Sequence, residues 1–239
     1  MSGRLANSVL FFLMLISLKV ASQNSITSPA APEVIKRIKI YKQLVKNNPS
    51  ARMTDIKKLV PDILLDLRYA TKNNFMHRKL YSALSTTYLR LAALRALDSV
   101  ATSLRAKGLG LKIFDAYRPY GVTKKMWDLI RDERYVANPA KGSGHNRGAT
   151  VDLTLVQLAT GQELDMGTGF DNFSDTAHHT FTRLPEQVLS NRKLLRTLME
   201  QHGFVALETE WWHYSLANAK DFPLLDISFK KLKKEAEND

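Results

Sequence analysis

One segment of this 239-residue chain combines a glycine-rich loop with an apolar strand: Gly142-Ser143-Gly144-His145-Asn146-Arg147-Gly148-Ala149-Thr150-Val151-Asp152-Leu153. Its glycine-rich first half presents His145 in a loop, and the apolar alternation that follows predicts a strand over residues 149–156. Neighbouring side chains of a strand point to opposite faces, so Asp152 should face away from Val151 and Leu153. A carboxylate buried in such a strand needs a cation or several hydrogen bonds, and a metal shared with His145 would supply the cation.

A second segment combines an imidazole with carboxylates near the end of the chain: Glu208-Thr209-Glu210-Trp211-Trp212-His213-Tyr214-Ser215. His213, with His145 and Asp152, would complete three protein ligands and leave one position open, which is the layout of a catalytic zinc site. Zinc lowers the pKa of a bound water molecule to about 7. Glu210 is then the candidate general base that takes the proton of this water and passes it to the leaving amine.

The spacing of Glu210 and His213 poses a geometric difficulty. Residues three apart in a regular strand point to opposite faces, so these two side chains would not face one site together. We therefore predict either a bulge in this strand or a position for Glu210 in the turn that precedes it.

A third segment ends a short apolar run in polar residues and a proline: Phe114-Asp115-Ala116-Tyr117-Arg118-Pro119. Arg118 would be a fixed cation at a strand end, able to stabilise the oxyanion that forms when hydroxide attacks a peptide carbonyl. Asp115, three residues earlier, would orient Arg118. Each feature alone also has a structural interpretation, such as a plain ion pair between Arg118 and Asp115, but the three segments together favour a catalytic site.

The other candidate ligands and nucleophiles are few. His77 and His202 are interpreted as surface or core residues, and the pair His178-His179 is a second candidate for metal binding. The chain contains no cysteine, which excludes disulfides and a thiol nucleophile and leaves nitrogen and oxygen ligands for any metal.

Residues 1–22 predict a signal peptide. Arg4 supplies a positive start, residues 9–18 are apolar, and the small residues Val20-Ala21-Ser22 precede a candidate cleavage point. The apolar run is shorter than the about 20 residues of a membrane-spanning helix. We therefore expect export to the periplasm or the outside, with no stable membrane span after cleavage. An uncleaved anchor and a buried helix are the alternatives.

The chain is strongly basic, with a formal net charge of +12. No helix-turn-helix, zinc-finger or RNA-binding signature accompanies this charge, so nucleic acid is not an expected partner. Part of the charge belongs to Lys230-Lys231-Leu232-Lys233-Lys234, within a predicted basic polar tail over residues 229–239. For an exported protein, an anionic envelope surface is the favoured attraction.

The apolar fraction of 44% and the charged fraction of 24% are those of an ordinary globular protein. Periodicity predicts helices over residues 33–46, 86–106, 122–131 and 185–202. Strands are predicted over residues 59–69, 111–116 and 149–156, with a loop over 161–179 and a closing hairpin of 204–207 and 211–216. Because helices and strands do not alternate regularly, we predict one α+β domain over residues 51–228, with helices packed on a mainly antiparallel sheet. A leader with the first helix precedes it over residues 23–50.

The motifs resemble those of a known family. The patterns Ser143-x-His145-x-x-Gly148-x-x-x-Asp152 and Glu210-x-x-His213 resemble the zinc D-Ala-D-Ala dipeptidases and the related D,D-carboxypeptidases, as does Asp115-Ala116-Tyr117-Arg118-Pro119. Two stretches resemble the dipeptidase branch in particular: Asp66-Leu67-Arg68-Tyr69-Ala70-Thr71 with Asn74-Phe75, and Met166-Gly167-Thr168-Gly169-Phe170-Asp171. The resemblance extends from about residue 60 to residue 216.

The resemblance implies a fold of the Hedgehog and D,D-peptidase type, with one zinc ion per chain held by His145, Asp152 and His213. It implies that Glu210 is the general base, that Arg118 stabilises the transition state and that the substrate is a small D,D-dipeptide. The residues it implies near the substrate are Ser143, Tyr69 and Asp171, with Asp171 as the partner of the ammonium group. We add Asp115 to these substrate-binding residues as the carboxylate that orients Arg118.

Two alternatives stay open from the sequence. The same centre could serve a D,D-carboxypeptidase that trims peptidoglycan stem peptides, although the two dipeptidase-like stretches favour a dipeptidase. A non-catalytic, zinc-dependent binder of cell-wall peptides needs no general base, so Glu210 argues against it. The sequence also leaves open the oligomeric state, the physiological role and the preference at the second substrate residue.

Overall fold

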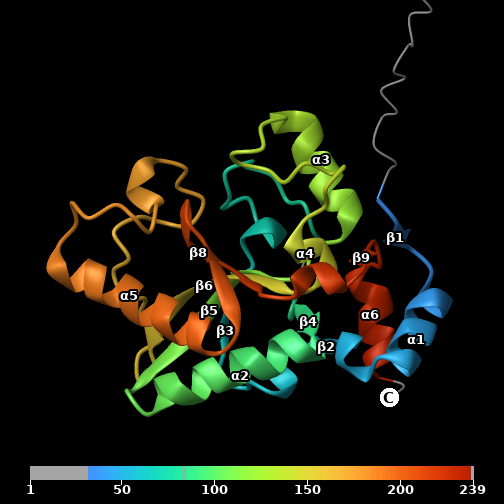
Figure 1. The fold of residues 1–239 in the computed structure, drawn as a ribbon, viewed down its shortest axis with the longest axis horizontal. Coiled ribbons are helices and arrows are strands. Elements are labelled where there is room, and N and C mark those ends of the chain that lie inside the picture. Colours follow the sequence, from blue (N-terminus) through green and yellow to red (C-terminus); the bar gives the residue numbers. More distant parts are fainter. Residues whose placement is uncertain (1–31, 83, 238–239) are drawn as a thin grey trace, which may run out of the picture. The chain divides into compact units, whose positions relative to one another are not determined.

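A five-stranded sheet with strand order β3-β5-β6-β8-β7 forms the centre of the structure (Figure 1). Its central strands are β5 (Leu109–Asp115), β6 (Thr150–Gln157) and β8 (Glu210–Leu216), and its edges are β3 (Leu64–Leu65) and β7 (Phe204–Leu207). Within this sheet, the β3–β5 pairing is parallel and the other three pairings are antiparallel. The predicted mainly antiparallel sheet is therefore confirmed.

The computed structural model describes residues 32–82 and 84–237, which belong to one compact unit. The predicted signal peptide over residues 1–22 and the first part of the predicted leader lie outside the described residues. Over the described ranges, no helix has both the length and the apolar character that a membrane crossing requires.

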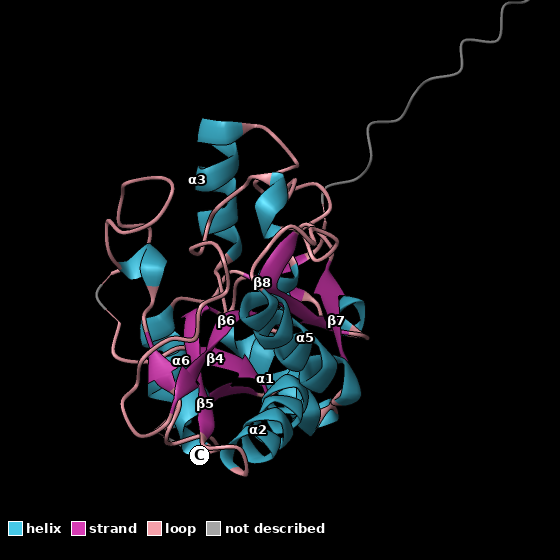
Figure 2. Ribbon diagram, turned by 90° about the vertical axis from the view of Figure 1, so that its left-hand side faces the viewer, coloured by secondary structure: helices cyan, strands magenta, loops and turns pink. Residues whose placement is uncertain are grey.

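Two long helices, α2 (Leu91–Arg105) and α5 (Glu186–Gln201), pack against each other and against the sheet (Figure 2). Their apolar stripes follow the helical period, and the stripe of α2 enters the main core with Leu94, Leu97, Val100 and Leu104. The same core contains Val151, Leu153 and Leu155 of β6. Helix α3 (Tyr120–Ile130) lies well apart from this pair, and the one-turn helix α4 (Gly144–Arg147) leads into β6.

The beginning and the end of the described chain pack together (Figure 1). Strand β1 (Val34–Ile35) pairs in parallel with β9 (Leu224–Leu225), and helix α1 (Ile38–Asn47) lies beside α6 (Phe229–Ala236). Tyr41 of α1 and Leu232 of α6 are buried in one small core. A further antiparallel pair joins β2 (Met53–Asp55) to β4 (Tyr88–Arg90).

Several elements differ from the sequence-based expectation. The strand expected over residues 59–69 is reduced to β3, because Val60-Pro61-Asp62-Ile63 forms a turn in which the Ile63 N–H donates to the Val60 carbonyl. Two expected helices begin later, since their first residues form β1 and β4 instead. Residues 229–236, expected as part of a polar tail, form α6 because Leu232 and Phe229 find apolar partners.

A buried arginine, Arg90, forms hydrogen bonds to three segments that are distant from one another in the sequence. Arg90, fully buried, donates from its guanidinium to the carbonyls of Ala51, Arg147 and Pro223 at 2.6, 2.7 and 3.0 Å. Its backbone N–H also donates to the Gly148 carbonyl at 2.7 Å. Burial lowers its pKa to about 10, which still leaves the side chain charged at neutral pH. Arg90 thus holds the end of α4 in place.

Arg90→Met is expected to lower the free energy of unfolding by at least about 2 kcal/mol, because it leaves one buried and two partly buried carbonyls without their donors. Urea unfolding measures this change. Arg95→Met is the control, because Arg95 is exposed on α2, the helix that directly follows Arg90. The stability of this variant should stay within about 0.5 kcal/mol of that of the wild type. Equal stability of the two variants would show that Arg90 has no such role.

Candidate active site

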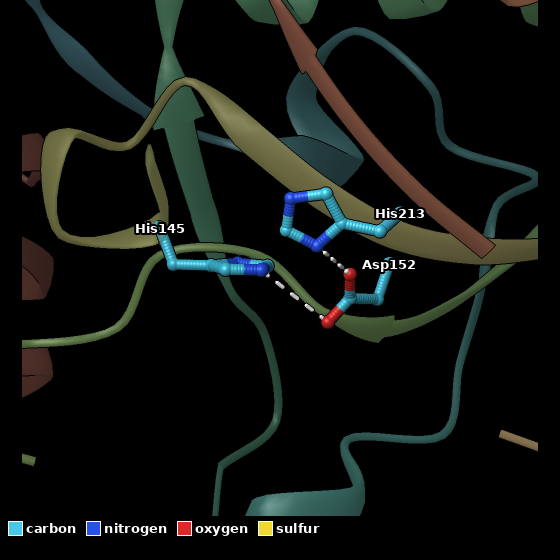
Figure 3. A group of neighbouring side chains, drawn as sticks. All are labelled: His145, Asp152 and His213. Atoms are coloured by element: carbon cyan, nitrogen blue, oxygen red, sulfur yellow. Dashed lines mark ion pairs between the residues drawn. The ribbon is translucent and has the colours of Figure 1, made fainter. Parts of the chain in front are cut away.

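Three side chains from separate parts of the sequence converge at one end of the sheet (Figure 3). His145 Nε2 lies 3.3 Å from Asp152 Oδ2, and His213 Nδ1 lies 2.9 Å from Asp152 Oδ1. One potential ligand atom from each residue lies within 4.8 Å of the other two. Among the described residues, this is the group whose histidine and carboxylate atoms are close enough to hold one metal ion.

Strand pairing brings two of these residues together. Asp152 of β6 is the direct partner of His213 on β8 and of Asp115 on β5, so the three side chains form a row across the central strands. Val151 and Leu153, which flank Asp152, are buried in the main core as the alternation predicts. The register of the three central strands therefore places Asp152 between Asp115 on one side and His213 on the other.

Helix α4 supplies the third side chain, His145. Ser143 caps this helix: its side chain accepts from the His145 N–H at 3.2 Å, and the Asn146 side chain accepts from the Ser143 N–H at 3.0 Å. Gly148 ends the helix with φ of 68°, a left-handed conformation that glycine adopts without strain, and the chain then enters β6. Gly148 thus allows the left-handed turn that joins α4 to β6.

The contacts of His145 orient its ring. Its Nδ1 lies 2.7 Å from the Ala116 carbonyl, which only accepts hydrogen bonds, so Nδ1 carries a proton and Nε2 is the nitrogen turned toward Asp152. A backbone carbonyl behind a histidine is the usual outer support of a metal ligand. Although burial opposes ionisation, His145 and His213 hold the pKa of Asp152 well below its ordinary value.

The donor set fits a zinc ion. Asp152 Oδ1 is buried and, although His213 Nδ1 lies 2.9 Å away, it has no hydrogen-bond partner in the described structure. A cation between the two imidazoles and the carboxylate would satisfy this oxygen. Two histidine nitrogens and one carboxylate oxygen are also a ligand set that catalytic zinc uses.

Glu210 lies beside this group despite its spacing from His213. On β7, Ala206 pairs with Tyr214 but the next residue, Leu207, pairs with Glu210, so the β7–β8 ladder is irregular at this point. Glu210 Oε2 consequently lies 3.6 Å from His213 Nδ1. The predicted irregularity is confirmed. Burial raises the pKa of Glu210, while His213 opposes this shift.

Arg118 is held by a buried chain of hydrogen bonds. Its Nε and Nη2 donate to Asp115 Oδ2 at 3.1 and 2.8 Å, and the Tyr81 hydroxyl donates to Asp115 Oδ1 at 3.0 Å. The guanidinium also lies over the Tyr69 ring, 5.0 Å from its centre. Sequence patterns did not single out Tyr81, because its contact with Asp115 spans 34 positions and leaves no local signature.

A cavity of about 670 Å³ joins these residues. Its lining includes the three candidate ligands and most of the other residues named from the sequence: Glu210, Arg118, Ser143, Tyr69 and Asp171. Asp115 is absent from this lining and is 1% exposed, so it lies behind Arg118 rather than against a substrate. The lining also contains Tyr135, Phe173 and His178, which sequence patterns did not assign to a site around His145.

The second candidate metal pair does not form a comparable group. His178 lines the cavity, and its Nε2 lies 3.9 Å from the exposed Asp175 carboxylate. His179 instead packs its ring against Tyr214, and burial lowers its pKa to about 4. The two neighbouring imidazoles therefore have different surroundings.

Asp171 is the anion at the other side of the cavity. It accepts hydrogen bonds from the Tyr69 hydroxyl at 3.0 Å and from the Phe75 N–H at 3.4 Å. Burial, and then the charge of Asp152, raise its pKa to about 7. Its φ of 60° is a left-handed conformation that aspartate and asparagine tolerate better than most residues.

Asp171→Asn is expected to stabilise the zinc-free protein. The folded pKa of about 7 exceeds the ordinary value of 3.8, so the unfolded chain gains from ionisation and the wild type loses stability as pH rises from about 4 to 7. The variant should therefore gain little at pH 4 and about 2–4 kcal/mol at pH 8. Unfolding in urea with chelator across this pH range measures the gain; a constant difference would contradict it.

Tyr81→Phe is expected to lower kcat by about tenfold with little change in KM, because Asp115 loses a donor and Arg118 becomes less well oriented. Steady-state kinetics on the dipeptide measure both constants. Tyr88→Phe is the matched control, since Tyr88 also packs near Phe229 but has no contact with Asp115 among the described interactions. A loss of the same size in both variants would assign the effect to packing.

The comparisons with known proteins agree with this geometry. A family model described as D-Ala-D-Ala dipeptidase matches residues 49–234. The D-alanyl-D-alanine dipeptidase of Escherichia coli is 34% identical over 180 residues, which cover 75% of this chain and 92% of that protein. Those of Enterococcus faecalis and Streptomyces coelicolor are 32% and 33% identical, each covering 73% of this chain and 94% of their own length. The chain therefore belongs to the D-Ala-D-Ala dipeptidase family of metallopeptidases.

Proposed function

We propose that this protein hydrolyses D-Ala-D-Ala and similar D,D-dipeptides in a zinc-dependent reaction. One observation carries the proposal: the group of His145, Asp152 and His213 shares a single cavity with Glu210 and Arg118. Relatives that the match covers over 92% and 94% of their own length bear the name D-alanyl-D-alanine dipeptidase, which supports the same substrate class. One zinc ion per chain corresponds to the one such ligand group found in residues 32–82 and 84–237.

His145 Nε2, His213 Nδ1 and the Asp152 carboxylate would hold the zinc ion. When bound, the ion acts as a Lewis acid and lowers the pKa of a water molecule toward neutrality. Asp152 is kept ionised, and His145 turns its Nε2 toward the same point. Although burial opposes it, the Asp152 carboxylate raises the pKa of His213, so binding of the ion would displace a proton from this imidazole.

Glu210 is the proposed general base. Its carboxylate accepts a proton from the attacking water while the water oxygen bonds to the peptide carbonyl carbon. When the C–N bond breaks, Glu210 returns this proton to the leaving amine, so the carboxylate is regenerated. A pKa raised by burial suits both steps, since the group then binds and releases a proton more readily near neutral pH.

Arg118 and Asp171 would hold the substrate at its two charged points. The Arg118 guanidinium donates to the oxyanion that develops on the carbonyl oxygen, and Asp115 and Tyr81 keep it in that orientation. Asp171 accepts from the ammonium group, whose positive charge favours the ionised carboxylate despite burial. Ser143 and Tyr69 complete the proposed substrate contacts from the cavity wall.

Export is part of the proposal. Residues 1–22 are proposed to direct the chain to the periplasm or the outside and to be removed there. Mass spectrometry of the protein isolated from the envelope or the medium measures the new N-terminus. A chain that keeps Met1 to Ser22 in the cytoplasm would exclude this part of the proposal.

A D,D-carboxypeptidase acting on stem peptides remains the second candidate, and the cavity volume favours it. Sites that hold drug-sized ligands span about 300–1,000 Å³, and a cavity of about 670 Å³ therefore has room beyond a dipeptide. Comparing turnover of free D-Ala-D-Ala with turnover of a stem pentapeptide separates the two activities.

The decisive assay is release of D-alanine from D-Ala-D-Ala by the purified protein, with and without a chelator. Release that stops with chelator and returns with zinc supports a zinc dipeptidase. Release from the pentapeptide alone would transfer the assignment to a carboxypeptidase. Absence of hydrolysis of both by zinc-loaded protein would favour a non-catalytic binder of cell-wall peptides.

A further inference from the structure

Helices α1 and α6 present a surface rich in lysine, outside the candidate active site. The two helices lie side by side (Figure 1), and Lys42 of α1 forms an ion pair with Glu235 of α6 at 2.9 Å. Lys58 donates to the Ala236 carbonyl at 3.2 Å and so joins a third segment to the end of α6. We define the basic surface by the exposed cations of these segments: Lys36, Arg37, Lys39, Lys42, Lys46, Lys57, Lys58, Lys230, Lys231, Lys233 and Lys234.

The helices that carry these cations are anchored to a small apolar core. Tyr41 and Leu232 are 2% and 1% exposed, and the Tyr41 hydroxyl accepts from the Met53 N–H at 2.7 Å. Both helices are therefore held by their apolar sides, which leaves the lysine side chains toward solvent. The cations outnumber the acids, since residues 33–47 contain five cations and one acid, and residues 228–237 contain four lysines and two acids.

Two exposed apolar side chains accompany the charge. Ile40 of α1 is 40% exposed, and Leu59, which follows Lys58, is 37% exposed. Basic helices with exposed apolar residues lie at membrane interfaces, where cations meet anionic headgroups and apolar groups enter the acyl boundary. A soluble polyanion would use the cations but would offer nothing to Ile40 and Leu59.

The basic surface lies partly outside the region that the family model matches and entirely outside the lining of the cavity. The family match begins at residue 49, and α1 therefore adds basic residues that lie outside the matched region. The cavity lining includes no residue of α1, α6 or residues 57–59, so contact here leaves the site open.

We propose that this basic surface binds the face of an anionic phospholipid bilayer. The attraction is electrostatic between lysine ammonium groups and phosphodiester headgroups, with a contribution from Ile40 and Leu59. It places the peptidase at a membrane surface with its cavity accessible to soluble peptides. The binding is independent of catalysis, so it can be tested whether or not the dipeptidase activity is found.

Sedimentation of the chain without residues 1–22, the form proposed to result from export, tests the proposal with vesicles. We expect at least tenfold stronger partitioning onto vesicles containing phosphatidylglycerol than onto phosphatidylcholine alone, and a loss of this difference between 0.05 and 0.5 M salt because exposed charges are screened. The apolar residues 9–18 and the cations Arg4 and Lys19 are then absent and take no part in the binding. Equal binding to both vesicles, or binding that salt does not weaken, would overturn the proposal.

Two charge-matched variants locate the binding surface. Replacing Lys39, Lys46, Lys230 and Lys233 with glutamate should abolish the preference for anionic vesicles, whereas the same change at the exposed Lys107, Lys124, Lys125 and Lys193 should retain most of it. Both variants should fold and hydrolyse dipeptide like the parent chain. Equal losses would assign binding to net charge, and binding of soluble polyphosphate but not of anionic vesicles would exclude the membrane as the partner.

Discussion

Glu210→Gln is expected to lower kcat for D-Ala-D-Ala by about 10²–10⁴-fold, the usual contribution of a general base. The amide keeps the size of the carboxylate but does not accept the proton of the attacking water. Glu210 is not one of the three candidate ligands, so the zinc content should equal that of the wild type. Steady-state kinetics together with metal analysis of the same sample measure the two quantities.

Glu208→Gln is the matched control for this variant. Glu208 lies two residues earlier, is exposed and pairs with Arg196 at 2.6 Å, and it does not line the cavity. Its rate should therefore equal that of the wild type. A Glu210→Gln protein with wild-type kcat would exclude Glu210 as the base, and one that loses zinc would give Glu210 a ligand role instead.

His145→Ala is expected to remove most of the bound zinc and, with it, the activity. The change deletes one of three protein ligands. The affinity for zinc should therefore fall by more than the factor of about 10 to 100 that follows the loss of a residue hydrogen-bonded to a ligand. It also leaves Asp152 with one imidazole neighbour instead of two. Metal analysis after dialysis against limiting zinc measures the loss.

His202→Ala controls for the removal of an imidazole. His202 Nε2 contacts Ser103 Oγ at 3.1 Å and lies outside the cavity lining, so zinc content and kcat should stay unchanged. The midpoint temperature of thermal unfolding is a second measurement. Added zinc should raise this temperature in His202→Ala but not in His145→Ala, because only a protein that binds the ion is stabilised by it. An unchanged zinc stoichiometry in His145→Ala would refute its ligand role.

Local sequence patterns predicted the elements that are long and regular. The alternation around Asp152 predicted β6, and the apolar periods predicted α2, α3 and α5 to within a few residues. The expectation failed where a tertiary partner decides the conformation. Residues 88–90 are extended because β2 pairs with them, and residues 229–236 are helical because Leu232 and Phe229 enter a core formed with α1.

Some residues of the candidate site could be named from the sequence, whereas the position of others depends on the tertiary structure. Residue types and motif spacing pointed to His145, Asp152, His213, Glu210 and Arg118, because metal binding and proton transfer need particular functional groups. Two of the residues implied near the substrate, Tyr69 and Asp171, share a hydrogen bond in the same cavity. Asp115 differs, since its contacts make it a support for Arg118 behind the cavity wall.

By itself, the sequence determined which side chains can bind a metal, and the alternation of β6 determined that Asp152 faces away from the core. Only the tertiary structure decided that Glu210 lies beside His213, because this depends on the irregular β7–β8 register. It also decided that Tyr81 supports Asp115 and that α1 and α6 form one basic surface. The physical reason is that spacing along the chain constrains local periodicity, whereas register and long-range packing arise only when distant segments meet.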